Sequence, residues 1–312
     1  MRNFGPIVPL VTPCSRAGEP DLDGLRAECK EMLEGGYKGI FVAGSTGRGP
    51  WFSRQDREKI CRTAAAQINR AVPLLAGVTG SGLPDMLENA HVMADAGAQM
   101  VVATVPGYFK YNSKEIETIY MRFADASPLP VMVYDIPEFT NTKLDQRMII
   151  HLARHGNIAA FKDSSTDYDR FQELASALEQ RPDFLLFQGK ENLIFESLRL
   201  GASGFIVSLI HLAPATFIRL YEAATAEDFN QAARIQEKIA RVLVLIRDSI
   251  DKHPESSTLF HMLNFAVRKR GVCENILLEL EGESPHWLIQ NAQKAVEILD
   301  TASDTSIHSL KG

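Results

Sequence analysis

Short apolar runs recur along the chain, and segments with helical spacing separate them. The runs carry Val, Ile, Leu and Phe at consecutive rather than alternate positions, which is typical of strands buried on both faces of a parallel sheet. Eight such runs lie at residues 7–11, 39–43, 74–78, 100–104, 131–134, 158–161, 184–187 and 204–207. Eight strands that alternate with helices favour a closed (β/α)8 barrel over a doubly wound sheet.

Helices are predicted between these runs and throughout the last third of the chain. Apolar residues repeat with helical spacing at 23–35, 54–69, 84–96, 113–126, 144–155, 168–180 and 192–200. After the eighth run the pattern is helical only, at 215–224, 228–250, 257–270 and 284–299. We therefore expect a (β/α)8 TIM barrel over residues 1–214, a C-terminal helical extension over 215–300 and a disordered tail over 301–312.

Polar residues and glycines indicate where several of these helices begin and end. Ser53 and Ser113 are predicted N-caps, because a serine hydroxyl can accept a hydrogen bond from the first helical turn. The pair Gly35-Gly36, Gly97 and Gly201 are predicted to end helices, since glycine adopts the left-handed backbone of a helix end at little cost.

Composition and charge narrow the class of protein. Of the 312 residues, 45% are hydrophobic and 23% are charged, which suffices for one large domain or two smaller ones. The net charge of −6 argues against a broad basic surface for nucleic acid or for an anionic membrane. Local anion sites remain compatible with this balance, so a small acidic substrate is not excluded.

The cysteines and the apolar segments predict a cytoplasmic protein. The four cysteines are scattered without CxxC pairs, which favours reduced thiols over a disulfide frame or a zinc site. They are Cys14, Cys29, Cys61 and Cys273. The N-terminal residues lack the apolar stretch of a signal peptide, and no window reaches about 18 uncharged apolar residues.

Lys162 is the first candidate for chemistry, because it directly follows the apolar run at 158–161. Active sites of (β/α)8 barrels lie at the carboxyl ends of the strands. A buried ammonium costs several kcal/mol, so such a lysine is usually paired, extended toward solvent, or neutral. A neutral lysine is a nucleophile toward carbonyl carbon. Lys162 therefore either reaches solvent past the strand end or forms a Schiff base.

Other strand ends carry groups that could bind or move charge. The glycine-rich turn around Ser45 and Thr46 offers backbone amides and hydroxyls to a carboxylate or phosphate, although a plain glycine turn has the same pattern. It lacks the Gly-Lys-Ser/Thr of a Walker A loop. Tyr134 is either a packing residue or an acid/base group. The remaining strand ends present Tyr108-Phe109, Gly189 and Ser208.

Five spaced motifs, taken together, resemble the pyruvate-dependent class I aldolases and lyases typified by dihydrodipicolinate synthase and N-acetylneuraminate lyase. The resemblance covers the first 210 or so residues in order. The motifs are Pro-Leu-Val-Thr-Pro at 9–13, Gly-Ser-Thr-Gly at 44–47, Tyr-Asp-Ile-Pro at 134–137, Lys-Asp-Ser-Ser at 162–165 and Gly-Ala-Ser-Gly-Phe-Ile-Val-Ser at 201–208.

The resemblance implies a role for each matched residue. Lys162 would form an imine with a 2-oxo acid, and the iminium would serve as the electron sink, so no separate cofactor is expected. Tyr134 would be the acid/base, with Ser45 as its hydrogen-bond relay. Thr46 and the main chain at Ile206 would hold the substrate carboxylate. Further substrate contacts are expected from Gly189, Tyr108, Thr140 and Ser208.

Two departures from the family pattern favour a sugar-acid substrate. Arg48 stands where many members carry glutamate, and this version resembles 2-keto-3-deoxygluconate aldolases. Residues 138–141 read Glu-Phe-Thr-Asn, without the arginine that binds the second substrate's carboxylate in dihydrodipicolinate synthases. The distal part of the substrate would then face polar residues, unless these form a plain surface charge cluster. The candidates are Glu138, Thr140, Asn141, Lys190, Glu191 and His211.

A third departure concerns the loop after the fourth strand. Many members place two tyrosines there, the second of which reaches a neighbouring subunit, whereas this chain reads Tyr108-Phe109. The intersubunit phenol is therefore either absent or supplied by Tyr108 or Tyr111. By resemblance we still expect a homotetramer.

Other functions stay open beside the preferred aldolase. The imine could support dehydration of the sugar acid, or a condensation of the dihydrodipicolinate synthase type. The chain could also be a non-catalytic pyruvate-binding or 2-oxo-acid-binding protein. A metal-dependent class II aldolase would need a histidine cluster, and the one histidine pair at helical spacing, His151 and His155, falls on the wrong layer of the barrel. No metal site is expected.

Overall fold

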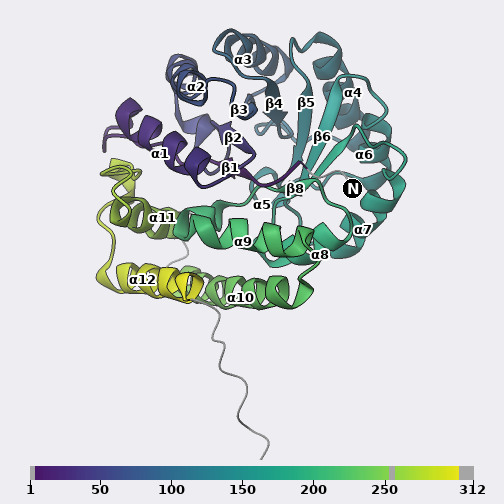
Figure 1. Ribbon diagram of the computed structural model, residues 1–312. Helices are drawn as coiled ribbons and strands as arrows, with labels where there is room; N and C mark the ends of the chain where they lie inside the picture. Colours follow the sequence, from purple (N-terminus) through teal and green to yellow (C-terminus); the bar gives the residue numbers. More distant parts are fainter. Residues whose placement is uncertain (1–3, 253–256, 302–312) are drawn as a thin grey trace, which may run out of the picture.

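The computed structural model describes residues 4–252 and 257–301 and contains the predicted parallel barrel (Figure 1). Its strands follow one another in sequence order around the sheet, and every neighbouring pair is parallel. They are β1 (Ile7–Pro9), β2 (Gly39–Val42), β3 (Leu74–Gly77), β4 (Met100–Ala103), β5 (Val131–Asp135), β6 (Ile158–Asp163), β7 (Leu185–Gln188) and β8 (Gly204–Phe205).

The seam between β8 and β1 is tied through the backbone. The amides of Phe4 and Gly5 both donate to the carbonyl of Ser203. A Cβ at Gly204 would lie 2.0 Å from the Gly5 carbonyl oxygen, so only glycine permits this approach. The predicted eighth strand at 204–207 is shorter, because the chain turns at Ser208 into a 3-10 helix, η3 (Ser208–Leu212).

Helices surround the barrel strands. They are α1 (Leu22–Glu34), α2 (Arg54–Ile68), α3 (Leu83–Asp95), α4 (Ser113–Ala126), α5 (Pro137–Thr140), α6 (Gln146–Leu152), α7 (Tyr168–Ala177) and α8 (Ile194–Arg199). The short α5 was not predicted. The helix predicted at 144–155 begins later, since Leu144 is held by a hydrogen bond from its amide to Asp135 and Asp145 is the N-cap.

Of the two predicted N-caps, Ser53 is confirmed and Ser113 is wrong. The Ser53 side chain accepts a hydrogen bond from the amide of Asp56 at the start of α2. The N-cap of α4 is Asn112 and not Ser113, because the Asn112 side chain and Glu115 form a reciprocal capping box. An asparagine is as good a cap as serine, so the sequence alone did not distinguish two adjacent candidates.

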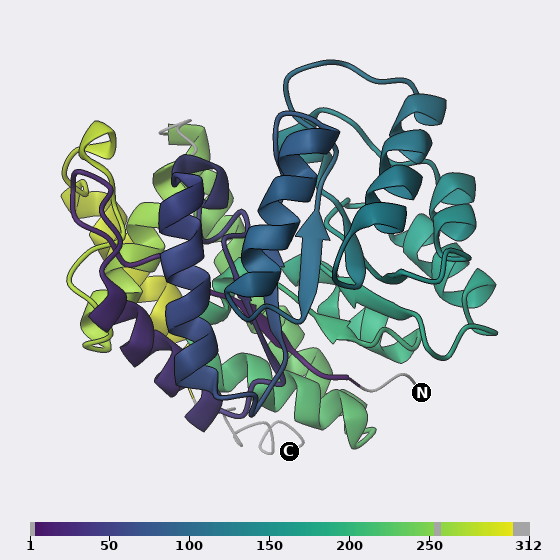
Figure 2. The same ribbon diagram turned by 90° about the horizontal axis from the view of Figure 1, so that it is seen from above.

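The C-terminal helices lie along one side of the barrel (Figures 1 and 2). They are α9 (Pro214–Thr225), α10 (Phe229–Lys252), α11 (Ser257–Lys269) and α12 (His286–Asp300). Helix α9 packs on α8, and α10 and α11 contact α12. Apart from Thr301, the tail predicted over 301–312 lies outside the described residues.

Two hydrophobic clusters divide the core of the barrel. One fills the lumen and includes Phe41, Met132, Tyr134, Phe187 and Ile206. The larger one lies between the strands and the surrounding helices. Successive residues of a strand point to opposite sides of the sheet, so each strand serves both clusters. All four cysteines are free thiols and buried.

Candidate active site

Lys162 faces the lumen near the carboxyl end of β6. Its side chain is buried at 4% exposure, and Nζ lies 4.0 Å from the ring centre of Tyr134 and 5.7 Å from that of Phe41. The β5–β6 register places Tyr134 directly beside Lys162. Within the described residues, no hydrogen bond or ion pair holds the Lys162 amine. The amine is therefore not engaged by a carboxylate and remains available to a carbonyl group.

Gly189 keeps space open next to this lysine. A Cβ at Gly189 would lie 2.0 Å from Ser164 Oγ and 3.1 Å from Lys162 Cε. The amide of Gly189 donates to the carbonyl of Asp163 at 2.7 Å, which fixes the end of β7 against β6. The glycine is thus required by the close packing around the lysine.

The turn after β2 brings predicted residues together. The amide of Gly49 donates to the carbonyl of Gly44, and a Cβ at Gly49 would lie 1.8 Å from the carbonyl oxygen of Ala43. This compact turn places Thr46 Oγ1 2.8 Å from Ser208 Oγ, so residues from both ends of the barrel sequence meet.

A cavity of about 700 Å³ opens at this end of the barrel. Of the predicted residues, four line it: Ser45, Tyr108, Tyr134 and Thr140. Lys162, Thr46, Ile206, Gly189 and Ser208 do not line it directly. Phe41 and Tyr134, the two rings that flank the Lys162 amine, do line it, so the amine lies behind the cavity wall.

The mouth of the cavity is built partly by the C-terminal extension. Arg48 makes two hydrogen bonds to Glu281, at 2.6 and 2.7 Å, and its guanidinium stacks 3.7 Å from the ring centre of Phe260. Arg48, Phe260 and Glu281 all line the cavity. The long separation in sequence left no local signal for this contact.

Most of the polar residues predicted to meet the distal substrate are engaged elsewhere. Lys190 Nζ pairs with Glu138 at 2.9 Å, and Glu191 accepts hydrogen bonds from the amides of Ser208 and Leu209. The cavity is not lined by four of these residues, which are Glu138, Asn141, Lys190 and Glu191. Thr140 does, although its hydroxyl also lies 3.1 Å from the carbonyl oxygen of Ile136.

The prediction for His211 is wrong. The residue is completely buried, and its Nε2 lies 2.9 Å from the carbonyl oxygen of Pro9. Its Nδ1 faces Glu28 of α1 at 3.3 Å. The residue belongs to η3, whose turn directs the side chain toward α1 rather than into the cavity.

The loop after β4 carries two exposed rings. Tyr108 and Phe109 are 82% and 66% exposed and stack edge to face, with ring centres 4.9 Å apart. Tyr108 lines the cavity, whereas Tyr111 packs against the outer core. A contact of this loop with a neighbouring subunit, and with it the homotetramer, stays a prediction.

The histidine pair on α6 and just after it contacts carboxylates of α4. His151 Nδ1 bonds to Glu117, and His155 Nε2 lies 3.0 Å from Asp125. Both carboxylates lie at least 30 residues from the histidines in sequence. Among the described residues, no three His, Cys, Asp or Glu side chains are placed to share a metal ion.

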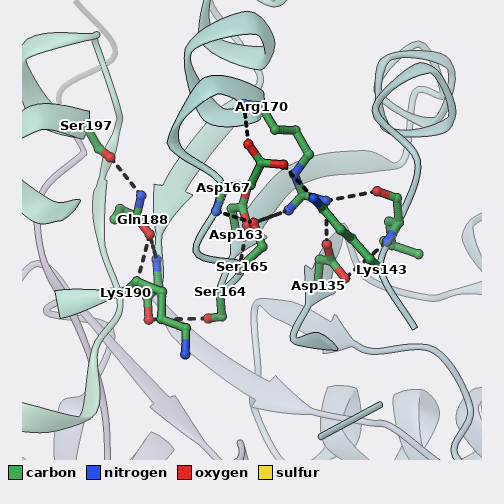
Figure 3. Close-up of polar contacts among 12 residues, drawn as sticks. Asp135, Lys143, Asp163, Ser164, Ser165, Asp167, Arg170, Gln188, Lys190 and Ser197 are labelled. Atoms are coloured by element: carbon green, nitrogen blue, oxygen red, sulfur yellow. Dashed lines mark hydrogen bonds and ion pairs between the residues drawn. The ribbon is translucent and has the colours of Figure 1, made fainter. Parts of the chain in front are cut away.

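Sequence reasoning missed a buried charge cluster beside the lysine (Figure 3). Arg170 of α7 binds Asp135 at 2.7 Å and Asp163 at 2.5 Å. Burial raises the pKa of Asp135 to about 6, and the positive charge of Arg170 opposes that rise. The available signal was an aspartate directly after each of the two reacting candidates, Tyr134 and Lys162.

The parallel strands and the lysine in their lumen define the class of the protein as a (β/α)8 barrel with a buried amine near the carboxyl ends of its strands. The model of the dihydrodipicolinate synthetase family matches residues 3–274. The chain belongs to this family and is an enzyme, a carbon–carbon lyase of the class I aldolase type. Among the described helices, none has the length and apolarity needed to cross a membrane.

Individual relatives are similar to this chain in sequence or in fold. The chain is 30% identical over 251 residues to the 4-hydroxy-tetrahydrodipicolinate synthase of Exiguobacterium sibiricum, covering 80% of this chain and 85% of the relative. A dihydrodipicolinate synthase structure from Aquifex aeolicus superposes with a TM-score of 0.82 at 25% identity, covering 95% of this chain and 97% of that one. A prophage protein of the family from E. coli, solved in complex with pyruvate, gives a TM-score of 0.84 at 23% identity over 95% and 98% of the two chains.

Proposed function

We propose that Lys162 is the Schiff-base residue of this lyase and that the substrate is a 2-oxo acid. The neutral amine adds to the ketone carbon, the carbinolamine loses water, and the iminium accepts the electron pair when a bond at C3 breaks. The observation that carries this proposal is the buried Lys162 amine, free of carboxylates and 4.0 Å from the Tyr134 ring centre. The iminium is itself the electron sink, so the proposed reaction uses no cofactor.

The other predicted residues take their proposed roles around the imine. Tyr134 protonates the carbinolamine oxygen so that it leaves as water, and Ser45, which lines the same cavity, relays the proton. The amides of the turn at Ser45 and Thr46 receive the carboxylate, and the main chain at Ile206, whose amide donates to the carbonyl of Gln188, completes the pocket. The contact between Thr46 and Ser208 supports this role, because it holds the turn close to the end of β8.

For the carbonyl partner we propose a neutral hydroxy aldehyde. It is the fragment that a sugar acid such as 2-keto-3-deoxygluconate releases together with pyruvate. Two arginines line the cavity; Arg48 is paired with Glu281, and Arg57 is buried and bonds to Asn89. Arg48 thus offers little to a second carboxylate, whereas Arg57 keeps its Nε without a hydrogen-bond partner among the described residues. Hydroxyls of Thr79, Thr104 and Thr140 line it and suit a polyol.

A second candidate is condensation of pyruvate with aspartate semialdehyde. The names of curated relatives favour it, since proteins 26–31% identical to this chain are 4-hydroxy-tetrahydrodipicolinate synthases. The residues at 138–141 count against it, because they include no arginine and the cavity is lined there by Phe139 and Thr140. Assay of both partners with one enzyme preparation separates the two candidates.

The test is borohydride trapping with pyruvate, read by intact mass and peptide mapping. We expect a gain of one reduced pyruvate on the peptide with Lys162, no gain in Lys162→Ala, and the full gain in Lys30→Ala. Lys30 is the matched control, an exposed lysine on α1 near Glu34. An adduct that persists in folded Lys162→Ala would contradict the assignment, and no adduct in the wild type would contradict the proposed reaction.

Trapping alone does not establish turnover. Release of pyruvate from 2-keto-3-deoxygluconate, followed with lactate dehydrogenase, distinguishes a lyase from a protein that binds 2-oxo acids without reaction. Loss of water from 2-keto-3-deoxygluconate without pyruvate release would instead favour the dehydratase alternative.

A further inference from the structure

The two proposed reacting residues are each followed by an aspartate that points the other way. Tyr134 and Lys162 face the lumen, where their side chains meet. Because side chains alternate along a strand, Asp135 and Asp163 point outward toward the helices. The register pairs Tyr134 with Lys162 and Asp135 with Asp163. Each aspartate is the chain neighbour of a reacting candidate, so a contact that holds Asp135 against Asp163 also holds Tyr134 against Lys162.

Arg170 of α7 joins the two aspartates. Its Nη1 donates to Asp135 Oδ2 at 2.7 Å, and its Nη2 donates to Asp163 Oδ1 at 2.5 Å (Figure 3). Both carboxylates are 1% exposed and Arg170 is 6% exposed, so solvent screens these contacts little. We call Asp135, Asp163 and Arg170 the β5–β6 clamp.

Further bonds fix the clamp to the surrounding loops. Arg170 Nη1 also donates to the carbonyl of Leu144 at 2.9 Å, and Nη2 donates to Ser165 Oγ at 2.9 Å. The side chain of Asp167, which is the N-cap of α7, accepts a hydrogen bond from the Arg170 amide, and its other oxygen pairs with Lys143. The guanidinium is thus held on several sides and has little freedom to follow a shift of either strand.

The backbone repeats the connection between the strand ends. The amide of Ser164 donates to the carbonyl of Asp135 at 2.8 Å, and the amide of Gly189 donates to the carbonyl of Asp163. A planar guanidinium that forks between two carboxylates adds an angular constraint that these single bonds lack.

We propose that Arg170 is a positioning residue, whose bonds to Asp135 and Asp163 set the relative placement of Tyr134 and Lys162 for proton transfer at the imine. This inference rests on the proposed function. Arg170 lies outside the lumen and does not touch the reacting atoms. Without it, the two buried carboxyl groups on adjacent strands would lose the cation that joins them, and protonation of one to relieve their repulsion would leave the strand ends without this tie. A displacement of about 1 Å in a reacting group can lower a rate about 100-fold.

The test follows exchange of the C3 protons of pyruvate in deuterated water by nuclear magnetic resonance. This exchange needs the imine and a proton acceptor but no aldehyde, so the identity of the carbonyl partner does not affect it. We expect Arg170→Met to lower kcat for exchange about 10- to 100-fold, with a smaller change in KM. Borohydride should still trap pyruvate on Lys162 at saturating substrate. Arg170→Lys should recover part of the rate, because it restores the charge without the fork.

The matched control is Arg270→Met, which removes a partly buried arginine that bonds Glu31 and the carbonyl of His211, away from the lysine. We expect wild-type exchange from its folded form. Folded Arg170→Met with a wild-type exchange rate would overturn the proposal, as would an equal loss in Arg270→Met.

Two further outcomes are covered. If Arg170→Met does not fold, Asp135→Asn decides, since it weakens one arm of the clamp without a change in size; a folded variant with wild-type exchange overturns the proposal. If the wild type itself shows no exchange and no trapping, the proposed function has failed, and the clamp is refuted with it.

Discussion

Two buried polar clusters lie beside the barrel, and they differ in charge: one contains ionised groups and the other neutral ones. In the β5–β6 clamp, one guanidinium contacts two carboxylates. In the second cluster, which we call the Glu28–His211 pair, an imidazole faces one carboxyl group at 3.3 Å. Glu28 and His211 are each 0% exposed, so the two clusters are similarly removed from water. The two clusters differ in the basic group that contacts the carboxyl groups, which is a guanidinium in the first and an imidazole in the second.

The Glu28–His211 pair is held neutral. Burial lowers the pKa of His211 to about 3 and raises the pKa of Glu28 well above its ordinary value. His211 Nε2 donates to the carbonyl of Pro9, which can only accept, so Nδ1 carries the lone pair toward Glu28. Arg270 bonds to Glu31 and to the carbonyl of His211, and not to Glu28.

The contrast teaches that burial alone does not decide the ionisation of a carboxyl group. Arg170 stays charged when buried, because its pKa is far above neutrality and its two partners raise it further. An imidazole loses its proton at a modest cost and then offers no charge to its partner. The clamp can therefore act through strong charged bonds, whereas the neutral pair contributes mainly packing and weak hydrogen bonds.

The largest effect we predict is the loss of stability in Arg170→Met. Removal of the shared cation leaves Asp135 and Asp163 buried side by side, which we expect to lower the free energy of unfolding by about 3–5 kcal/mol. Arg270→Met should cost less, because Glu31 is partly exposed and water can solvate it. Urea unfolding at pH 7 measures both variants. A change within about 1 kcal/mol for Arg170→Met would remove the contrast.

The second prediction concerns acid. The unfolded state takes up a proton on residue 211 near pH 6.5, while the folded state resists until about pH 3. The contribution of His211 is therefore fully present above pH 6.5 and is lost as the pH falls. Relative to His211→Gln, which keeps a donor for Pro9, the wild type should lose about 2 kcal/mol between pH 6 and pH 4.5.

The control for this second prediction is the same pair of proteins above pH 7, where the difference in stability should stay constant with pH. Parallel stability curves for the two proteins from pH 7 down to pH 4.5 would show that folded His211 accepts a proton at its ordinary pKa. The neutral description of the Glu28–His211 pair would then be wrong.

The sequence predicted the strands and helices of the barrel better than the buried polar contacts between them. Runs such as 158–161 are readable as strands because both faces are buried, so their apolar character is continuous. The place of Lys162 at the end of such a run left two roles open, and the reacting role was implied only by the resemblance of the spaced motifs. The clamp was within reach, since Asp135 and Asp163 each follow a candidate residue, but the arginine that unites them lies on a later helix.

Contacts between distant segments were beyond sequence reasoning. His211 was assigned to the cavity because it follows the eighth strand, yet η3 turns it toward Glu28. Arg48 was interpreted as a family variant, and nothing local pointed to Glu281. Local patterns encode strand and helix faces, whereas a partner across the fold depends on how a loop turns.

The smallest effect we predict is that of Glu28→Gln, which replaces a protonated carboxyl with an amide of nearly the same shape. The amide oxygen can still accept the hydrogen bond that the Val11 amide donates to Glu28 Oε1, so we expect a change within about 1 kcal/mol at pH 4.5. The raised pKa of Glu28 means that its contribution is fully present below pH 4.5 and is lost as the pH rises toward the folded value. Glu28→Gln should therefore gain stability relative to the wild type between pH 5 and pH 7, measured by urea unfolding.

Asp163→Asn, its counterpart in the clamp, should lose stability at pH 7, because it removes a charge that Arg170 binds. If both substitutions destabilise equally at pH 7, Glu28 is ionised in the folded protein and the two clusters do not differ as described.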